Sequence, residues 1–165
     1  MTYVLVFPIL QRYTYKHNDL IVVVENNEFV PCSERFFMKI LLVDDSNTML
    51  MTMERMLKEL GYSKVLKTQS PVDAVKIVKA TKIDLILLDW NMPEMAGLDL
   101  LIELKGNEKT RHIPVIMVTA DGTTERVGKA IENGAEGFIV KPVNKDALKI
   151  RLQDIAESNK LGLKY

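Results

Sequence analysis

The chain has 165 residues, which is the size of one ordinary domain or of one domain with an appendage, and this excludes a large multidomain enzyme. Lysine and arginine together number 22, as do aspartate and glutamate, so no overall charge draws the chain to nucleic acid or to an anionic membrane surface. Hydrophobic residues make up 47% and charged residues 27%, which is the composition of a globular protein.

Cysteine content and hydropathy indicate the compartment. Cys32 is the single cysteine, so no disulfide can form within the chain, as expected in a reducing environment. No uncharged apolar run approaches the roughly 18 residues of a membrane span, and the first residues lack the basic start and small-residue cleavage site of a secretory signal. We therefore expect a soluble, cytoplasmic protein.

The character of the sequence changes at Met38. Residues 1–37 hold seven of the eleven aromatic residues and none of the eight glycines, whereas turn signals and helix caps recur regularly only afterwards. We therefore divide the chain into an N-terminal extension at 1–37, a domain at 38–157 and a tail at 158–165 that is too short for an output domain.

The extension is the least interpretable part of the chain. The β-prone runs 20–24 and 29–30 flank the turn-prone pair Asn26-Asn27, a pattern compatible with a hairpin, but a lone hairpin is marginal in water. Because Met38 directly precedes a core strand, the favoured interpretation is upstream translation or an unpacked, disordered extension, with a folded accessory element as the alternative.

Beyond Met38, short apolar runs alternate with helical patterns five times. The runs are unbroken, as expected of strands buried on both faces of a sheet, and they comprise residues 40–43, 65–66, 85–88, 115–118 and 138–140.

Helix boundary signals stand between and after these runs. Gly61 can end the first helix in a left-handed conformation, and Ser70 followed by Pro71 can begin the second. The later helices are indicated by Leu98, Leu101 and Ile102 for the third, by Thr123 or Thr124 as the cap and Asn133-Gly134 as the stop of the fourth, and by Asn144 as the cap of the fifth.

Strands that alternate with single helices predict an α/β fold, a doubly wound five-stranded parallel sheet with right-handed crossovers and helices on both faces. In such sheets the binding site lies beyond the carboxyl ends of the strands. The residues that follow each apolar run are therefore the candidates for chemistry.

Four of the five runs end in a reactive polar residue. Asp44 and Asp45 follow the first run, Asp89 the third, Thr119 the fourth and Lys141 the fifth. Any one of them alone is compatible with a turn residue, a cap or a solvated charge. Four such strand ends with complementary charges favour one shared site.

The chemistry of this set points to a metal ion and to phosphoryl transfer. Two unit charges about 4 Å apart repel by roughly 4 kcal/mol at an effective dielectric constant of about 20, so three carboxylates need cations between them. Lys141 supplies one, and an all-oxygen set without cysteine or histidine favours Mg²⁺ over zinc. Asp89 is the candidate nucleophile, because it follows the most apolar run, while Asp44 and Asp45 suit the metal.

These residues resemble a known family. Four sets of residues are similar to the motifs of receiver domains of two-component response regulators, particularly the stand-alone chemotaxis type called CheY, over about residues 38–157. The sets are Asp44-Asp45, Asp89-Trp90-Asn91-Met92-Pro93, Thr119-Ala120 and Lys141-Pro142. The resemblance implies a flavodoxin-like sheet with strand order 2-1-3-4-5.

The resemblance also implies the site chemistry. Asp89 would accept a phosphoryl group from a sensor histidine kinase, Lys141 would pair with the phosphoryl oxygens, and Thr119 would donate its hydroxyl to them. The ligands of Mg²⁺ would be Asp44, Asp45, Asp89 and the backbone carbonyl of Asn91. Lys141-Pro142 is a candidate cis peptide bond.

Thr119 and Phe138 would form the switch. In the family, movement of the threonine hydroxyl shifts the loop after the fourth strand, and an aromatic residue on the fifth strand, here Phe138, turns inward. Many chemotaxis members have tyrosine at this position, so Phe138 offers a partner no hydroxyl. A downstream protein would bind the surface formed by the fourth helix, fifth strand and fifth helix.

We therefore expect a single-domain response regulator of a phosphorelay, with chemotaxis as a candidate pathway and with no nucleic-acid or membrane partner. It would be a switch that catalyses only its own phosphorylation and dephosphorylation. The rival from another class is a Mg²⁺-dependent phosphatase of the haloacid dehalogenase type, which needs a second aspartate two residues after the nucleophile, where this chain has Asn91. A flavin- or nucleotide-binding domain ranks lower, because no glycine-rich phosphate loop follows the first strand.

Overall fold

The computed structural model describes residues 4–7, 12–17, 20–25, 28–31 and 38–160, and it describes side chains for residues 38–156. Within these residues the strands form two sheets, one of four strands and one of five. The sheets divide the chain in the region where the sequence changes character.

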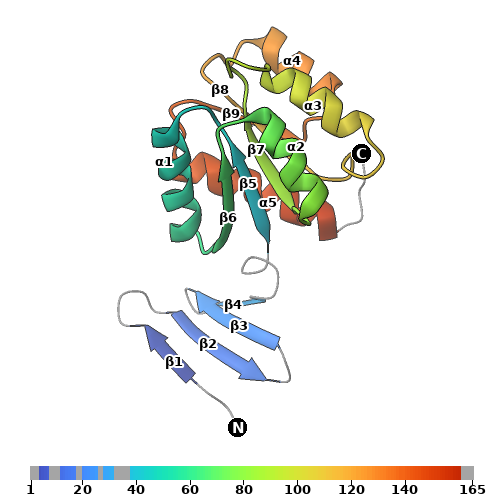
Figure 1. Cartoon of the computed structure of the whole chain (residues 1–165). Coiled ribbons are helices and arrows are strands. Elements are labelled where there is room, and N and C mark those ends of the chain that lie inside the picture. The colour runs from blue at the N-terminus through green and yellow to red at the C-terminus, as the bar shows by residue number, and fades with distance from the viewer. Residues whose placement is uncertain (1–3, 8–11, 18–19, 26–27, 32–37, 161–165) are drawn as a thin grey trace.

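The N-terminal segment contains a four-stranded antiparallel sheet whose strands follow one another in chain order (Figure 1). Its strands are β1 (Val4–Phe7), β2 (Arg12–His17), β3 (Leu20–Glu25) and β4 (Glu28–Pro31). The predicted hairpin is present as β3 paired with β4, while its turn, Asn26-Asn27, lies outside the described residues. The structure thus has strands in a segment for which the sequence favoured an unpacked extension. Each of the first three strands pairs with the one that follows it in the chain, which a lone hairpin cannot provide.

The second sheet is parallel and has the order β6-β5-β7-β8-β9, which is 2-1-3-4-5 when counted from β5 (Figure 1). Its strands are β5 (Lys39–Val43), β6 (Lys64–Thr68), β7 (Leu85–Asp89), β8 (Val115–Thr119) and β9 (Gly137–Val140). The predicted doubly wound sheet and its strand order are confirmed.

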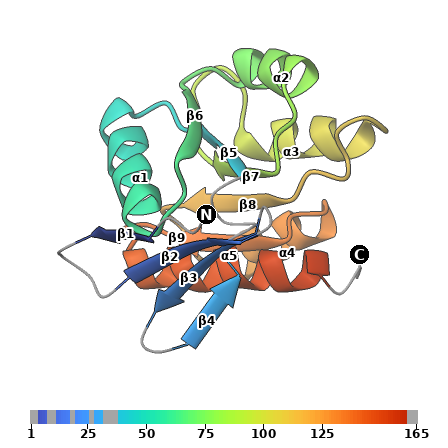
Figure 2. The same ribbon diagram turned by 90° about the horizontal axis from the view of Figure 1, so that it is seen from below.

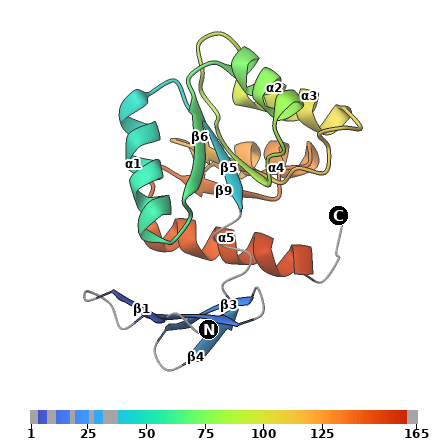
Figure 3. The same ribbon diagram turned by 60° about the horizontal axis from the view of Figure 1, so that its bottom comes forward.

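Five helices cover this sheet on both faces, as Figures 2 and 3 show. They are α1 (Asn47–Glu59), α2 (Pro71–Ala80), α3 (Gly97–Gly106), α4 (Thr124–Glu132) and α5 (Lys145–Lys160). One apolar core lies under α1 and α5, and the other lies under α2, α3 and α4. All residues of the middle strand β7 are buried, including Asp89 at its carboxyl end.

The helix ends follow the sequence signals with one exception. Gly61 and Gly134 adopt φ angles of +93° and +89°, which a residue without Cβ adopts without strain. The Ser70 hydroxyl and the Asn144 side-chain carbonyl cap α2 and α5. Thr123 stands at the N-cap of α4, but its hydroxyl makes no capping bond.

The two edge strands correct one prediction. We expected every apolar run to be buried on both faces, yet β6 has no buried residue, and Leu66 is 37% exposed. At the opposite edge, β9 leaves Val140 42% exposed. Strand order decides this burial, because an edge strand has a neighbour on one side only.

The helix α5 continues to Lys160, so the predicted domain end at residue 157 falls inside a helix, and residues 161–165 lie outside the described part of the chain. Among the described helices, none combines the length and the apolar character needed to cross a bilayer.

Candidate functional site

The polar strand ends meet because neighbouring strands of the sheet are parallel and in register. Val43 of β5 lies opposite Leu88 of β7, and Thr119 of β8 lies opposite Val140 of β9. The residues that follow these positions therefore emerge from one edge of the sheet. This is where the sequence predicted a shared site. The side chains of Asp44, Asp45, Asp89 and Lys141 converge there, while Thr119 ends β8, the strand between β7 and β9.

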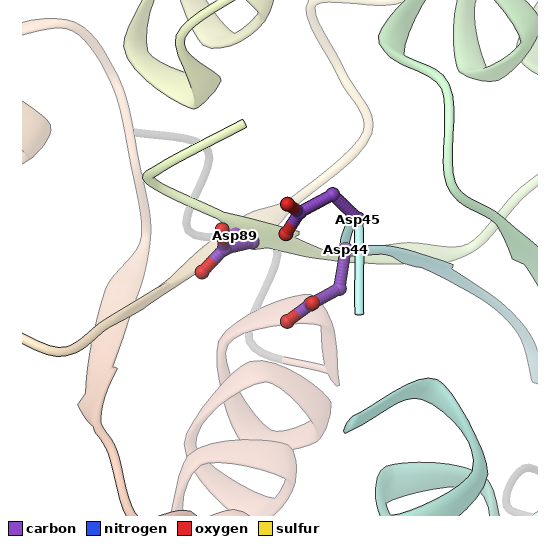
Figure 4. Close-up of side chains that lie close together, drawn as sticks. All are labelled: Asp44, Asp45 and Asp89. Atoms are coloured by element: carbon purple, nitrogen blue, oxygen red, sulfur yellow. The ribbon is translucent and has the colours of Figure 1, made fainter. Parts of the chain in front are cut away.

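The first feature of the site is an aspartate cluster formed by Asp44, Asp45 and Asp89, shown in Figure 4. One carboxylate oxygen from each residue lies within 4.8 Å of the other two. Asp44 is 0% exposed and Asp89 is 2% exposed, whereas Asp45 is open to solvent. Two charges are thus held away from water, and one remains accessible.

Lys141 neutralises part of this charge. Its Nζ lies 2.9 Å from Oδ2 of Asp44 and 2.7 Å from Oδ1 of Asp89, so one ammonium group bridges the two buried carboxylates. Burial alone would lower the pKa of Lys141, but the hydrogen bonds and charges of Asp89 and Asp44 outweigh it and raise the pKa above its usual value. The lysine is therefore charged at neutral pH. The peptide bond that follows it, Lys141-Pro142, is cis, as predicted.

Asp89 has an environment that separates it from an ordinary surface aspartate. Burial raises its pKa, and the bond from Lys141 opposes this rise without cancelling it. Its second oxygen, Oδ2, accepts the backbone N–H of Asn91 at 3.0 Å. The carboxylate is held in place from both sides while its negative charge is only partly offset.

Asp44 is fixed in a similar way by local structure. Its Oδ1 accepts the backbone N–H of Ser46 at 2.8 Å, and Ser46 is the residue whose hydroxyl caps α1. The start of this helix therefore orients the carboxylate toward Lys141. The neighbouring Asp45 has its backbone carbonyl bonded by the Gln69 side chain, which connects the loops after β5 and β6.

Thr119 is the last residue of β8, the strand next to β7, and it is buried, with 2% exposure. Its hydroxyl donates to the backbone carbonyl of Asp121 at 3.1 Å and accepts the Asp121 N–H at the same distance. Its hydroxyl thus closes a small loop after β8 and bonds to that loop rather than to the carboxylates.

Phe138 stands apart from the carboxylates in its contacts. It lies on β9 opposite Met117, and its half-buried ring packs against the core under α2, α3 and α4. The guanidinium carbon of Arg151 lies 5.7 Å from the ring centroid, a cation–π contact from α5. Among the described contacts, no hydrogen bond or ion pair joins Phe138 to the aspartate cluster.

Sequence reasoning missed Gly97 as a site residue. A Cβ on Gly97 would lie 1.9 Å from the backbone carbonyl oxygen of Asp89, and the Gly97 N–H donates to the carbonyl of Trp90 at 2.9 Å. The start of α3 therefore packs directly on the backbone that carries Asp89. A glycine at a helix start gives no signal of this contact in the sequence, because the contact depends on how α3 packs against the end of β7.

The aspartate cluster suits a hard divalent cation. Three carboxylate oxygens from two adjacent strand ends converge, one of the three residues faces solvent, and the described cluster offers no nitrogen or sulfur ligand. Magnesium prefers this combination, since it retains several waters and takes few carboxylates.

The geometry defines a class of signalling domain, and comparison with known proteins agrees with it. The family model described as the response regulator receiver domain matches residues 40–153, so the chain belongs to this family. It is a receiver domain of the CheY-like type, and receiver domains are switches that bind Mg²⁺ at an acidic site.

Individual relatives refine this assignment. The chain is 38% identical to chemotaxis protein CheY-3 of Vibrio cholerae over 120 residues. The matched region covers 73% of this chain and 92% of that protein. It is also 38% identical over 123 residues to CheY1 of Helicobacter pylori, covering 74% and 99%. Among solved structures, the signal receiver domain of a histidine kinase from Syntrophus aciditrophicus matches with a TM-score of 0.66 and 34% identity, covering 77% of this chain and 92% of that one.

Proposed function

We propose that this chain is a single-domain response regulator in which Asp89 accepts a phosphoryl group from a sensor histidine kinase. The observation that carries the proposal is the position of Asp89: a buried carboxylate at the end of the central strand, bound by one ammonium group and flanked by two further carboxylates. Such a carboxylate is fixed in place before any donor arrives.

The proposed reaction moves the phosphoryl group between two side chains. A carboxylate oxygen of Asp89 bonds to phosphorus, the bond from phosphorus to the donor histidine nitrogen breaks, and its electron pair stays on that nitrogen. Lys141 lies at the carboxylate and would exchange part of its contact with Asp44 and Asp89 for the phosphoryl oxygens. The same site would later release the group to water, so the chain modifies itself and turns over no external substrate.

Magnesium is the proposed cofactor. The proposed ligands are the carboxylates of Asp44, Asp45 and Asp89 and the backbone carbonyl of Asn91. The three carboxylates already lie close together. When bound, the ion withdraws negative charge from the phosphoryl group and from the surrounding carboxylates. Lys141 alone offsets one charge of the three, which leaves room for a divalent cation in the charge balance.

The proposed switch uses Thr119 and Phe138. To donate to a phosphoryl oxygen, the Thr119 hydroxyl must leave the carbonyl of Asp121, and this loosens the loop that leads into α4. Phe138 lies on β9, next to β8 in the sheet, where such a movement would change its surroundings. The face formed by α4, β9 and α5 is the proposed docking surface for a downstream protein.

The names of the curated relatives support chemotaxis as a pathway, while the Syntrophus aciditrophicus match shows that the same fold also occurs within a histidine kinase. We propose a chemotaxis role in the cytoplasm on the first ground. The phosphatase alternative still lacks its second aspartate, since the residue two positions after Asp89 is Asn91, whose backbone N–H binds the Asp89 carboxylate.

The test is phosphorylation by a small donor. The chain is incubated with acetyl phosphate and Mg²⁺, and the adduct is measured by intact mass and located by peptide mapping. We expect one base-labile phosphoryl group on Asp89, none in Asp89→Asn, and none when the metal is chelated. An adduct on another residue, or steady phosphate release from many phosphate esters, contradicts the proposal.

A further inference from the structure

One arginine links the two loops that flank the proposed phosphoacceptor. Arg126, in the first turn of α4, places its Nε 3.2 Å from Oδ2 of Asp121 and its Nη1 3.2 Å from Oδ1 of Asn91. Its guanidinium carbon also lies 5.3 Å from the centroid of the Trp90 ring. A single side chain therefore contacts the loop after β7 and the loop after β8.

These loops occupy equivalent positions relative to the site. Asn91 comes two residues after Asp89, and Asp121 comes two residues after Thr119, at the ends of neighbouring parallel strands. The backbone N–H of Asn91 binds the Asp89 carboxylate, and the backbone N–H of Asp121 binds the Thr119 hydroxyl. Each loop is thus fixed to the site through its backbone and to Arg126 through its side chain.

The charge of Arg126 is already satisfied by these contacts. The Asp121 carboxylate pairs with its positive charge, and the side-chain carbonyl of Asn91 accepts a second N–H. The ring of buried Trp90 lies against the guanidinium group. Lys141, in contrast, binds both buried carboxylates directly. Arg126 therefore differs from Lys141: it holds the side chains of Asn91 and Asp121 in place, whereas Lys141 supplies positive charge to the phosphoacceptor.

We propose that Arg126 is a positioning residue that holds the side chains of Asn91 and Asp121 across the end of β7 and β8, and so limits the access of water to the aspartyl phosphate. The inference rests on the proposed function of Asp89. In the hydrolytic step a water oxygen bonds to phosphorus, the bond between phosphorus and the Asp89 oxygen breaks with its electron pair returning to the carboxylate, and the water proton leaves with the phosphate.

Geometry explains why the bridge affects this step. In-line attack brings water to phosphorus from the side opposite the Asp89 oxygen, which is beyond the strand ends. Asn91 and Asp121 belong to the loops that leave these strand ends, and Arg126 binds the side chains of both. Without the guanidinium, two short side chains of opposite loops lose their common partner and can move apart.

The experiment measures the lifetime of the phosphorylated chain. The full chain and its variants are loaded with acetyl phosphate and Mg²⁺, desalted rapidly, and followed by intact mass. Arg126→Ala removes the bridge, and Arg126→Lys keeps the charge but cannot form both contacts through one planar group. Lys129→Ala is the matched control, since Lys129 is a cation of the same helix that pairs only with Glu125 among the described contacts.

We expect dephosphorylation to become roughly fivefold faster in both Arg126→Ala and Arg126→Lys, as for loss of a charge-assisted contact worth about 1 kcal/mol. Lys129→Ala should stay within about twofold of the parent chain. In a background carrying Asn91→Ala and Asp121→Ala, Arg126→Ala should add less than about twofold, because the residues through which it acts are gone.

Three results overturn the inference. They are an unchanged or slower rate in Arg126→Ala, recovery of the parent rate in Arg126→Lys, and a full additional effect in the doubly substituted background. Failure of the proposed function is distinct, because the parent chain would then form no adduct on Asp89 at all, and the inference would fall with it. Unfolding midpoints are measured for all variants to test whether a rate change comes from partial unfolding.

Discussion

Lys141 is the residue whose removal tests the electrostatics of the site most directly. Lys141→Met keeps the length and apolar stem of the side chain and removes the ammonium group from Asp44 and Asp89. At separations of up to 4.8 Å, two of the carboxylates repel by about 3.5 kcal/mol at an effective dielectric constant of about 20. Breaking a buried ion pair from one side costs about 3–5 kcal/mol.

We therefore expect Lys141→Met to lower the free energy of unfolding by about 3 kcal/mol in buffer that contains a chelator. The lower end of the range applies because Asp89, whose pKa burial already raises, can take up a proton and relieve part of the repulsion. The control is Lys145→Met, since Lys145 pairs with Glu59 at 3.1 Å in an exposed position and should contribute less than about 0.5 kcal/mol.

Added Mg²⁺ should restore stability to Lys141→Met more than it stabilises the parent chain, because the ammonium group and the metal compete for the same carboxylates. Metal at roughly thirty times its dissociation constant contributes about 2 kcal/mol. Urea unfolding with and without Mg²⁺ measures both effects. A loss below about 1 kcal/mol in chelator, or equal stabilisation of both chains by Mg²⁺, would refute the reasoning.

Three further outcomes are expected. In chelator at neutral pH, Asp89→Asn should raise the free energy of unfolding by about 1–2 kcal/mol, because it removes one of three mutually repelling carboxylates while Lys141 keeps its pair with Asp44. Because burial raises the pKa of Asp89, the folded chain keeps a proton that the unfolded chain loses. The stability gained by Asp89→Asn should therefore grow as pH rises from the pKa of Asp89 in the unfolded chain to its pKa in the folded chain, and it should vanish below that range. Urea unfolding at several pH values measures this dependence. Gly97→Ala should destabilise by about 3 kcal/mol in thermal or urea unfolding, since its Cβ would meet the Asp89 carbonyl at 1.9 Å, whereas Gly128→Ala, with nothing within 4 Å, should not destabilise. A chain that begins at Met38 should still unfold cooperatively and accept the phosphoryl group on Asp89; a molten chain would show that residues 1–37 are needed for the fold.

The sequence alone determined the fold class and the members of the aspartate cluster. Apolar runs located the five strands of the parallel sheet, and the rule that parallel strands present their carboxyl ends at one edge predicted the meeting of Asp44, Asp89 and Lys141. These inferences succeed because the alternation of strands with helices, and the polarity of the residues that follow each strand, can be read directly along the chain. The order of the strands came from resemblance to a family instead.

Tertiary structure decided what depends on partners distant in the chain. It made β6 and β9 edge strands, so that apolar Leu66 and Val140 are partly exposed. It placed Gly97 against the backbone of Asp89 and Arg126 between two loops, contacts that no spacing along the sequence encodes. Such contacts depend on how helices dock on the sheet, and docking is set by the packing of the whole core.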